Sequence, residues 1–252
     1  MNSHQRRMAI YDRLVNNKTV EVNDLASKYQ VSTMTIRRDL LLFEKQGLVT
    51  TTYGGAYLNQ GMSAEASFSL KATQMTKEKQ HIGTYAATLI NEFDTIIIDC
   101  GSTALQLAKN LPNIKMTVIT NSWPLIHFLG NNSKIKLILA PGEYSNISAG
   151  ALDSKTVAFF NSVNADKAFI STQAFDFKRG LTVPDPVDAE VKKSMLNAAK
   201  SCYLLLDHTK IGQTYLSKHG ELIDFDQVIV DQDINEEDYQ KLKAINPHII
   251  KA

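Results

Sequence analysis

Residues 30–47 have the sequence QVSTMTIRRDLLLFEKQG, and this stretch decides how the first part of the chain folds. Apolar residues recur at helical spacing after Ser32 and Thr33, either of which can cap the first turn of a helix. Gly47 is a typical residue for ending such a helix. We expect the apolar residues of this helix to face a small core: Met34, Ile36, Leu40 and Phe43.

Two shorter helices are predicted before this one. Residues 4–16 carry apolar side chains at helical spacing, and Asn23 is placed to cap a second helix over residues 24–29, after a brief extended piece at 18–22. Gln30 and Val31 form the turn to the third helix. Three helices within fifty residues, the last two joined by a tight turn, predict a helix-turn-helix.

A β-hairpin is predicted directly after the third helix. Residues 48–53 and 56–58 have strand-forming residues, and the paired glycines Gly54 and Gly55 interrupt them. A hairpin in this position is typical of the wing of a winged helix.

The third helix has the side chains that a DNA-reading helix needs. Thr33, Thr35, Arg37 and Arg38 are polar, and arginine makes bidentate bonds to guanine while hydroxyls contact phosphates or base edges. An isolated run of this kind also fits an ordinary surface helix with solvated arginines. Together with the turn and the hairpin, it favours binding of double-stranded DNA.

Charge is distributed unevenly along the chain. Residues 1–60 contain eight basic and five acidic residues, whereas the remainder contains 19 basic and 21 acidic ones. A modestly basic head suits an anionic partner, although so small an excess is also compatible with a solvated face.

The cysteine pattern and the apolar runs limit the class of protein. Cys100 and Cys202 are far apart and have no nearby Cys or His cluster, so neither a disulfide scaffold nor a zinc site is indicated. The first residues lack the features of a secretion signal, and no later stretch has the apolar length of a membrane span. We expect a cytoplasmic protein with no cofactor, no metal and no membrane partner.

Strand-like apolar runs alternate with helical stretches in the rest of the chain. This alternation predicts an α/β domain with a mostly parallel sheet and helices on both faces. We therefore expect a winged helix-turn-helix domain at 1–58, a small and polar linker at 59–75, and an α/β domain at 76–252 that begins with a helix over about 76–91. The predicted strands are Thr95–Asp99, Met116–Thr120, Ile135–Ala140, Lys167–Ser171, Tyr203–Asp207 and Gln227–Asp231.

Polar residues follow three of these strands. Gly101, Ser102 and Thr103 precede a helix over 104–110, where free amides and the helix dipole favour a phosphate, although an ordinary helix cap has the same sequence. The segments 120–122 and 207–210 follow two other strands in the same way. Because the carboxyl ends of parallel strands share one edge, we expect these loops to converge on a ligand.

Individual side chains in these loops suit a phosphorylated sugar. Lys210 can meet an anion, with a solvated surface lysine as the alternative. Hydroxyl and amide groups of Thr120, Asn121 and Ser122 can hold sugar oxygens. Glu190 and Lys193 lie one helical turn apart and by themselves more often form a surface ion pair than a site.

Several motifs resemble those of the DeoR family of bacterial regulators. In the head these are Val31-Ser-Thr-Met-Thr-Ile-Arg-Arg-Asp-Leu, Glu44-Lys-Gln-Gly-Leu-Val and Gly54-Gly-Ala. In the second domain they are Asp99-Cys-Gly-Ser-Thr, Thr120-Asn-Ser, Ala165-Asp-Lys-Ala-Phe-Ile, Glu190-Val-Lys192 and Asp207-His-Thr-Lys210.

The resemblance implies which residues bind each partner. It implies a sensor domain that resembles sugar-phosphate isomerases and a phosphorylated sugar as effector. The implied DNA contacts are Ser32, Thr33, Thr35, Arg37 and Arg38. The implied effector site comprises Asp99, Gly101, Ser102, Thr103, Thr120, Asn121, Ser122, Glu190, Lys192 and Lys210. Thr51 and Tyr53 stand where the family usually has an arginine and a histidine, and Pro141-Gly142 and Thr172-Gln-Ala replace more glycine-rich stretches.

Three functional interpretations follow. We expect a homo-oligomeric transcription regulator, and the resemblance suggests a repressor of sugar-metabolism genes. A sugar-phosphate isomerase is the alternative, with Glu190, Asp99 or Asp166 as general base, but no base and acid pair can be assigned. Cys100 at a helix N-terminus suits a redox switch, yet a small buried side chain is its expected role.

Overall fold

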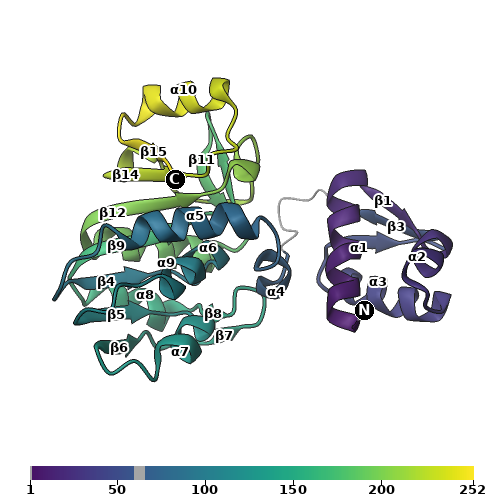
Figure 1. Cartoon of the computed structure of the whole chain (residues 1–252), viewed down its shortest axis with the longest axis horizontal. Coiled ribbons are helices and arrows are strands. Elements are labelled where there is room, and N and C mark those ends of the chain that lie inside the picture. The colour runs from purple at the N-terminus through teal and green to yellow at the C-terminus, as the bar shows by residue number, and fades with distance from the viewer. Residues whose placement is uncertain (1, 60–65) are drawn as a thin grey trace. The chain divides into compact units, whose positions relative to one another are not determined.

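The computed structural model describes residues 2–59 and 66–252. The chain divides into two compact units, residues 1–74 and 75–252 (Figure 1). We call the first unit the head and the second, after the family domain that its motifs resemble, the sensor domain.

The head contains three main helices and a three-stranded antiparallel sheet. The third helix begins after Ser32, which caps it, as one of the two predictions had it. The second helix begins at Val22, so the predicted cap at Asn23 is wrong; Glu21 precedes the helix in extended conformation and makes no side-chain cap. The elements are α1 (Ser3–Asn17), β1 (Thr19–Glu21), α2 (Val22–Tyr29), α3 (Thr33–Lys45), β2 (Val49–Thr51) and β3 (Gly55–Leu58), with the strands in the order β1-β3-β2.

One apolar core holds the head together. Ile36, Leu40 and Phe43 of α3 are buried in it, as predicted. The expectation for Met34 is wrong, because its side chain is 58% exposed. Met34 precedes Ile36 by two residues, which at about 100° per residue places the two on opposite sides of the helix.

A short helix lies in the segment that was expected to be a linker. Residues 60–65 of that segment are outside the described part of the chain, but α4 (Phe68–Lys71) follows, and its Leu70 is buried in the core of the head. Hydrogen bonds from Thr73 to Met8 and from Gln74 to Asp12 connect this segment to α1.

The sensor domain is built on a seven-stranded parallel sheet, which confirms the predicted α/β class. All six predicted strands are present with changes in their ends, and one further strand lies at an edge of the sheet. Their order is β15-β14-β12-β9-β4-β5-β6. The bounds are β4 (Thr95–Ile98), β5 (Met116–Thr120), β6 (Ile135–Leu139), β9 (Ala165–Ser171), β12 (Ala199–Leu206), β14 (Gln227–Val230) and β15 (Ile249–Lys251).

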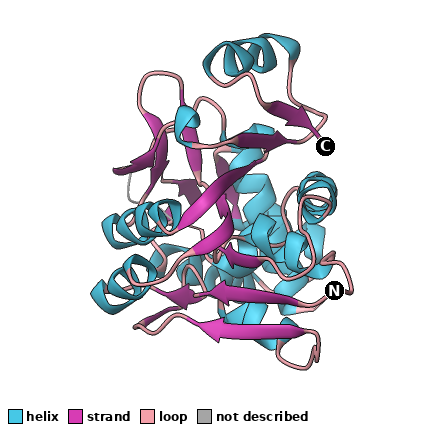
Figure 2. Cartoon of the chain, turned by 90° about the vertical axis from the view of Figure 1, so that its left-hand side faces the viewer, coloured by secondary structure: helices cyan, strands magenta, loops and turns pink. Residues whose placement is uncertain are grey.

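Helices cover both faces of this sheet (Figure 2). One apolar cluster joins α5, α6 and α7 to residues such as Ile96 and Ile98, and a second joins α8, α9 and α10 to residues such as Ile97. The side chains of β4 thus alternate between two cores. The helices are α5 (Thr76–Ala87), α6 (Ser102–Lys109), α7 (Trp123–Leu129), α8 (Ser154–Asn161), α9 (Pro186–Asn197) and α10 (Glu236–Ile245), with short turns at η1 (His208–Lys210) and η2 (Leu222–Asp224).

Two small antiparallel sheets were not predicted. Their strands are short and lack a clear β pattern. The first contains β10 (Ala174–Asp176), β11 (Gly180–Val183) and β13 (Ser217–Gly220), and the second pairs β7 (Tyr144–Ser145) with β8 (Gly150–Ala151).

The strand order reverses between β4 and β9. From β4 the chain proceeds to β5 and β6 on one side, and from β9 to β12, β14 and β15 on the other. Ligands of open α/β sheets bind outside the carboxyl ends of the strands at such a switch point. None of the helices in the described part of the chain has the length and apolar character of a membrane span.

Candidate functional sites

The residues predicted to contact DNA gather at the start of α3. The Ser32 hydroxyl accepts a hydrogen bond from the Thr35 amide at 3.2 Å and lies 2.9 Å from the Thr35 hydroxyl. Ser32, Thr33 and Arg38 are exposed, and Thr35 and Arg37 are half-buried. The structure therefore places all five polar side chains at the cap and in the first two turns of one helix.

Asp39 directly follows these arginines on α3 and interacts with α1. Its carboxylate accepts from Arg6 Nε at 2.7 Å and lies 3.8 Å from Arg7 Nε, both on α1. No carboxylate in the described residues forms an ion pair with Arg37 or Arg38. The two guanidinium groups thus keep their charge available for an anion.

The hairpin is attached to α3 at two points. Where β2 ends, Glu44 accepts hydrogen bonds from the Thr51 amide (2.8 Å) and hydroxyl (2.7 Å), which lower the pKa of Glu44. At its tip, the Arg37 guanidinium lies 5.6 Å from the ring centre of Tyr53, whose side chain is 94% exposed. An added Cβ at Gly55 would lie 2.0 Å from the Val20 carbonyl oxygen, so a glycine is required there.

Asp99 forms the centre of the predicted effector site. It follows β4 at the switch point and is fully buried. One carboxylate oxygen accepts from Lys192 Nζ (2.7 Å), the Ser171 hydroxyl (2.6 Å) and the Ser171 amide (3.0 Å), and the other accepts from the Cys100 amide (2.7 Å). Elements β4, β9 and α9 therefore meet at one side chain.

Lys192 is a buried lysine that forms an ion pair with Asp99. Its ammonium group also lies 3.6 Å from the Asp188 carboxylate, one turn earlier on α9. Burial alone would lower the pKa of Lys192, but Asp188 and Asp99 outweigh burial and raise it. Burial alone would raise the pKa of Asp99, but the charge and hydrogen bond of Lys192, together with the hydrogen bonds of Ser171, lower it. Both groups are charged at neutral pH.

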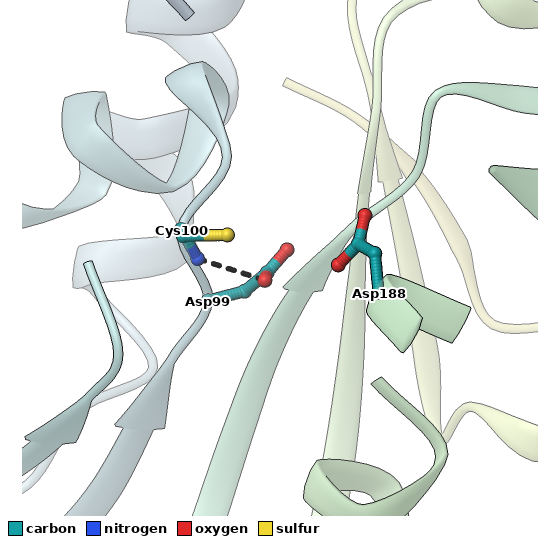
Figure 3. Close-up of side chains that lie close together, drawn as sticks. All are labelled: Asp99, Cys100 and Asp188. Carbon is teal, nitrogen blue, oxygen red and sulfur yellow. Dashed lines mark hydrogen bonds between the residues drawn. The ribbon is translucent and has the colours of Figure 1, made fainter. Parts of the chain in front are cut away.

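Asp99, Cys100 and Asp188 approach one another closely (Figure 3). Their potential ligand atoms all lie within 4.8 Å of each other. The Lys192 ammonium group already lies beside both carboxylates, 2.7 Å from Asp99 and 3.6 Å from Asp188, so we assign no metal to this cluster. The Cys100 thiol is buried here.

The start of α6 lies at the same edge of the sheet, directly after β4. Gly101 precedes the helix, and no side chain caps it, so the first amides of Ser102 and Thr103 are not satisfied by a cap. A Cβ at Gly101 would lie 1.8 Å from the Ser171 hydroxyl oxygen, so only glycine fits beside β9. An uncapped helix N-terminus attracts an anion.

The residues after β5 divide into two roles. Thr120 donates its hydroxyl proton to the Ile98 carbonyl (2.7 Å) and accepts from the Ser122 amide (3.0 Å), so its hydroxyl is occupied within the protein. Asn121 donates from Nδ2 to the Ala151 carbonyl at 2.9 Å. The buried Asn121 Oδ1 and Ser122 Oγ atoms have no hydrogen-bond partner in the described part of the chain.

Basic groups gather at the end of β12. Asp207 is buried there, and burial alone would raise its pKa, but the charges of Lys210 and Lys79 outweigh burial and lower it. Lys79, on α5, is only 3% exposed. The ammonium groups of Lys210 and Lys79 thus place positive charge at this end of the sheet, which favours the approach of an anion.

The structure does not bring Glu190 to these residues. Its side chain is 59% exposed and pairs with Lys193 Nζ at 2.8 Å, which confirms the surface ion pair considered from the sequence. Asp188 and Lys192 lie on the buried side of the same helix.

Four further residues lie near the site and had no role predicted for them: Lys79, Ser171, Asp188 and His219. Lys79 had a usable signal, because Lys79, Ile82, Gly83 and Ala86 form one buried stripe of α5 at helical spacing. The other three depend on contacts between distant segments, which sequence spacing does not reveal.

Family models cover most of the chain. Residues 6–61 match the DeoR-like helix-turn-helix domain, and residues 74–232 match the DeoR C-terminal sensor domain. The chain belongs to the DeoR family of transcriptional regulators.

Individual sequence relatives agree with this assignment. The chain is 32% identical to the HTH-type transcriptional repressor GlcR of Bacillus subtilis strain 168, over 92% of this chain and 90% of the relative. It is 31% identical to the lactose phosphotransferase system repressor of Staphylococcus aureus strain N315, over 99% and 98% of the two chains. Ribose 5-phosphate isomerase A of Methanocaldococcus jannaschii matches with a TM-score of 0.40 and 16% identity over 54% of each chain. The sequence relatives are transcriptional regulators rather than enzymes, which decides against the isomerase alternative.

Proposed function

We propose that this protein represses genes of sugar metabolism and that a phosphorylated sugar, bound at the carboxyl edge of the parallel sheet, controls its affinity for operator DNA. Two relatives bear the name of repressor, one of them of a lactose phosphotransferase system, which supports the sugar-related role. The repressor acts in the cytoplasm as a homo-oligomer whose paired heads bind two half-sites of double-stranded DNA.

The head supports the DNA part of the proposal. Ser32, Thr33, Thr35, Arg37 and Arg38 are the proposed contacts. Asp39 is occupied by Arg6 and Arg7, and Arg37 and Arg38 remain without an acidic partner among the described residues. Arginines in this position suit bidentate contacts to guanine in the major groove.

One observation carries the effector part. A buried polar cluster stands at the switch point of the sheet, and within it Asn121 Oδ1 and Ser122 Oγ lack partners in the described chain. Buried polar groups without partners cost free energy, so a ligand that hydrogen-bonds to them gains affinity. The uncapped α6 at Gly101, Ser102 and Thr103 and the ammonium groups of Lys210 and Lys79 suit the phosphate, whereas Asp99 and Lys192 suit sugar hydroxyls.

Fluorescence anisotropy with labelled DNA from upstream of the protein's own gene tests the proposal. We expect sequence-preferential binding, weakened about five- to hundredfold in Arg37→Ala and Arg38→Ala, because a bidentate pair contributes about 1–3 kcal/mol. Lys109→Ala, which removes one exposed charge from the sensor domain, is the matched control.

The same titration tests the effector. Glucose 6-phosphate, fructose 6-phosphate, fructose 1-phosphate and ribose 5-phosphate are added at increasing concentration, each beside its free sugar. We expect one phosphorylated sugar to change the DNA affinity, and DNA to change its affinity by the same factor. Equal DNA binding with every sugar phosphate would contradict effector control, and absence of sequence preference would contradict the DNA-binding part.

A further inference from the structure

His219 is a buried histidine that has no role in the proposed effector site. It lies on β13, which pairs with β11, and it is only 1% exposed. The register of the pair passes from Leu181 opposite Gly220 to Thr182 opposite Lys218, so His219 is the extra residue of a β-bulge. Bulges redirect a side chain and are frequent beside functional sites.

The hydrogen bonds of Thr172 favour one tautomer of His219. The Thr172 hydroxyl lies 3.0 Å from the Ala174 carbonyl, 3.3 Å from the Thr182 carbonyl and 2.9 Å from His219 Nε2. A hydroxyl has one proton, and carbonyl oxygens only accept, so the arrangement that forms the most hydrogen bonds has Thr172 donating to a carbonyl and accepting from His219. We therefore assign the proton to Nε2 and the lone pair to Nδ1.

The ring stays neutral, and its second nitrogen is unused. Burial, and next the charge of Lys192, lower the pKa of His219 to about 3, with Asp99 acting in the opposite direction. In the described part of the chain, no group hydrogen-bonds to the buried Nδ1 atom. A neutral imidazole with Nε2 protonated offers Nδ1 only as an acceptor, so its missing partner is a donor.

The position of His219 links this missing donor to the proposed site. Thr172, its hydrogen-bond partner, directly follows Ser171, which donates twice to Asp99. Helix α9, which carries Lys192, packs against β13. The unpartnered Asn121 Oδ1 also needs a donor, and it lies along the same edge of the sheet. Hydroxyl groups of a sugar are donors, whereas an ionised phosphate offers only acceptors.

We propose that His219 is a ligand-binding residue of the sensor domain, and that its Nδ1 atom accepts a hydrogen bond from a hydroxyl group of the bound sugar phosphate. This inference rests on the proposed function of the same site. It assigns the neighbourhood of His219 to the polyol part of the ligand rather than to its phosphate.

Isothermal titration of the full-length protein with the sugar phosphate that alters DNA binding tests this assignment. In His219→Phe, which removes the acceptor and keeps a ring, we expect the Kd for the sugar phosphate to rise about tenfold. The Kd for inorganic phosphate should change less than twofold. His219→Gln, which retains a donor and an acceptor, should bind more tightly than His219→Phe, and the exposed His248→Phe is the matched control.

Deoxy analogues of the sugar phosphate keep the test valid if His219→Phe fails to fold. One analogue that lacks a single hydroxyl should bind wild-type protein about tenfold more weakly than the parent, and the two should bind His219→Gln with a smaller ratio. A Kd unchanged in His219→Phe, or ratios identical in both proteins, would show that Nδ1 binds only a buried water and would overturn the inference while the proposed function stands. If no sugar phosphate binds the wild type, both fail.

Discussion

Arg6 and Asp39 form a buried ion pair, 2.7 Å from Nε to the carboxylate oxygen, that joins the first helix of the head to the third. Both side chains are less than 10% exposed. Asp39 directly follows Arg37 and Arg38 in the chain, so the helix that carries the two arginines proposed to contact DNA is held in place by the next charged residue of the same run. The pair positions α3, on which Arg38 is exposed and Arg37 is half-buried.

Asp39→Asn should therefore destabilise the head. Removal of one partner of a buried pair leaves the other charge uncompensated and costs about 3–5 kcal/mol. Hydrogen exchange of the α3 amides in the full-length protein measures this loss, and the Trp123 fluorescence of the sensor domain should not change. Asp24→Asn, at an exposed position of α2, is the control. Unchanged protection of the α3 amides in Asp39→Asn would show that the ion pair does not stabilise the head.

Tyr53 should contribute to DNA binding through Arg37. The guanidinium lies 5.6 Å from the ring centre, and at an exposed site such a contact contributes about 0.5–1 kcal/mol. Tyr53→Ala should weaken operator binding about two- to fivefold, and Tyr53→Phe should retain it because the ring remains. Since the side chain is 94% exposed, neither change should alter the unfolding temperature.

A double-mutant cycle separates this indirect effect from direct DNA contact. If Tyr53 acts only by orienting Arg37, Tyr53→Ala should have no effect in an Arg37→Ala background. An undiminished effect there would show that Tyr53 contacts DNA independently of Arg37.

The parallel sheet was predictable because its strands are buried on both faces. Such strands form continuous apolar runs, for example Thr95–Ile98 and Tyr203–Leu206, which local sequence reveals. The strand Ser217–Gly220 has the sequence SKHG and no such pattern; it is a strand because β11 is beside it. The local sequence pattern therefore did not indicate that His219 lies near the site.

Helix α9 shows the same limit within the site. Its sequence predicted an ion pair between Glu190 and Lys193, which are one turn apart. The two residues do pair, and they lie on the exposed side of the helix. The buried pair of Asp188 and Lys192 has a similar spacing, and only the placement of Asp99 opposite the helix distinguishes the two. Charge spacing predicts ion pairs on a helix but not which face is covered.

His219 should make the stability of the sensor domain depend on pH. A histidine of the unfolded chain has a pKa of about 6.5, whereas the folded-state pKa of His219 is about 3 because burial and Lys192 oppose its protonation. Lys193 adds to Lys192, and Asp99 opposes both. Below pH 6.5 the unfolded state binds the extra proton, so stability is fully present above this pH and is lost as the pH falls toward 3.

The expected loss is about 2 kcal/mol between pH 7 and pH 5. Urea unfolding monitored by the fluorescence of Trp123, the one tryptophan of the chain, reports on the sensor domain. His219→Gln, which does not titrate, should remove most of this pH dependence. The same slope in wild type and in His219→Gln would mean that the buried ring is protonated in the folded protein.

Lys79 should select the phosphorylated form of the sugar. It is one of two ammonium groups near Asp207, and unlike Lys210 it is fully buried on the apolar stripe of α5. Lys79→Met keeps the length and the apolar part of the side chain and removes the charge. We expect the Kd for the sugar phosphate to rise tenfold or more, because a charged hydrogen bond to phosphate contributes about 1.5–3 kcal/mol. The Kd for the free sugar should remain within twofold, because the free sugar has no phosphate for Lys79 to bind.

Lys77→Met, at an exposed position of the same helix, controls for the loss of one charge. If Lys79→Met weakens the sugar and its phosphate equally, Lys79 supports the fold around Asp207 and the phosphate lies elsewhere along the edge of the sheet.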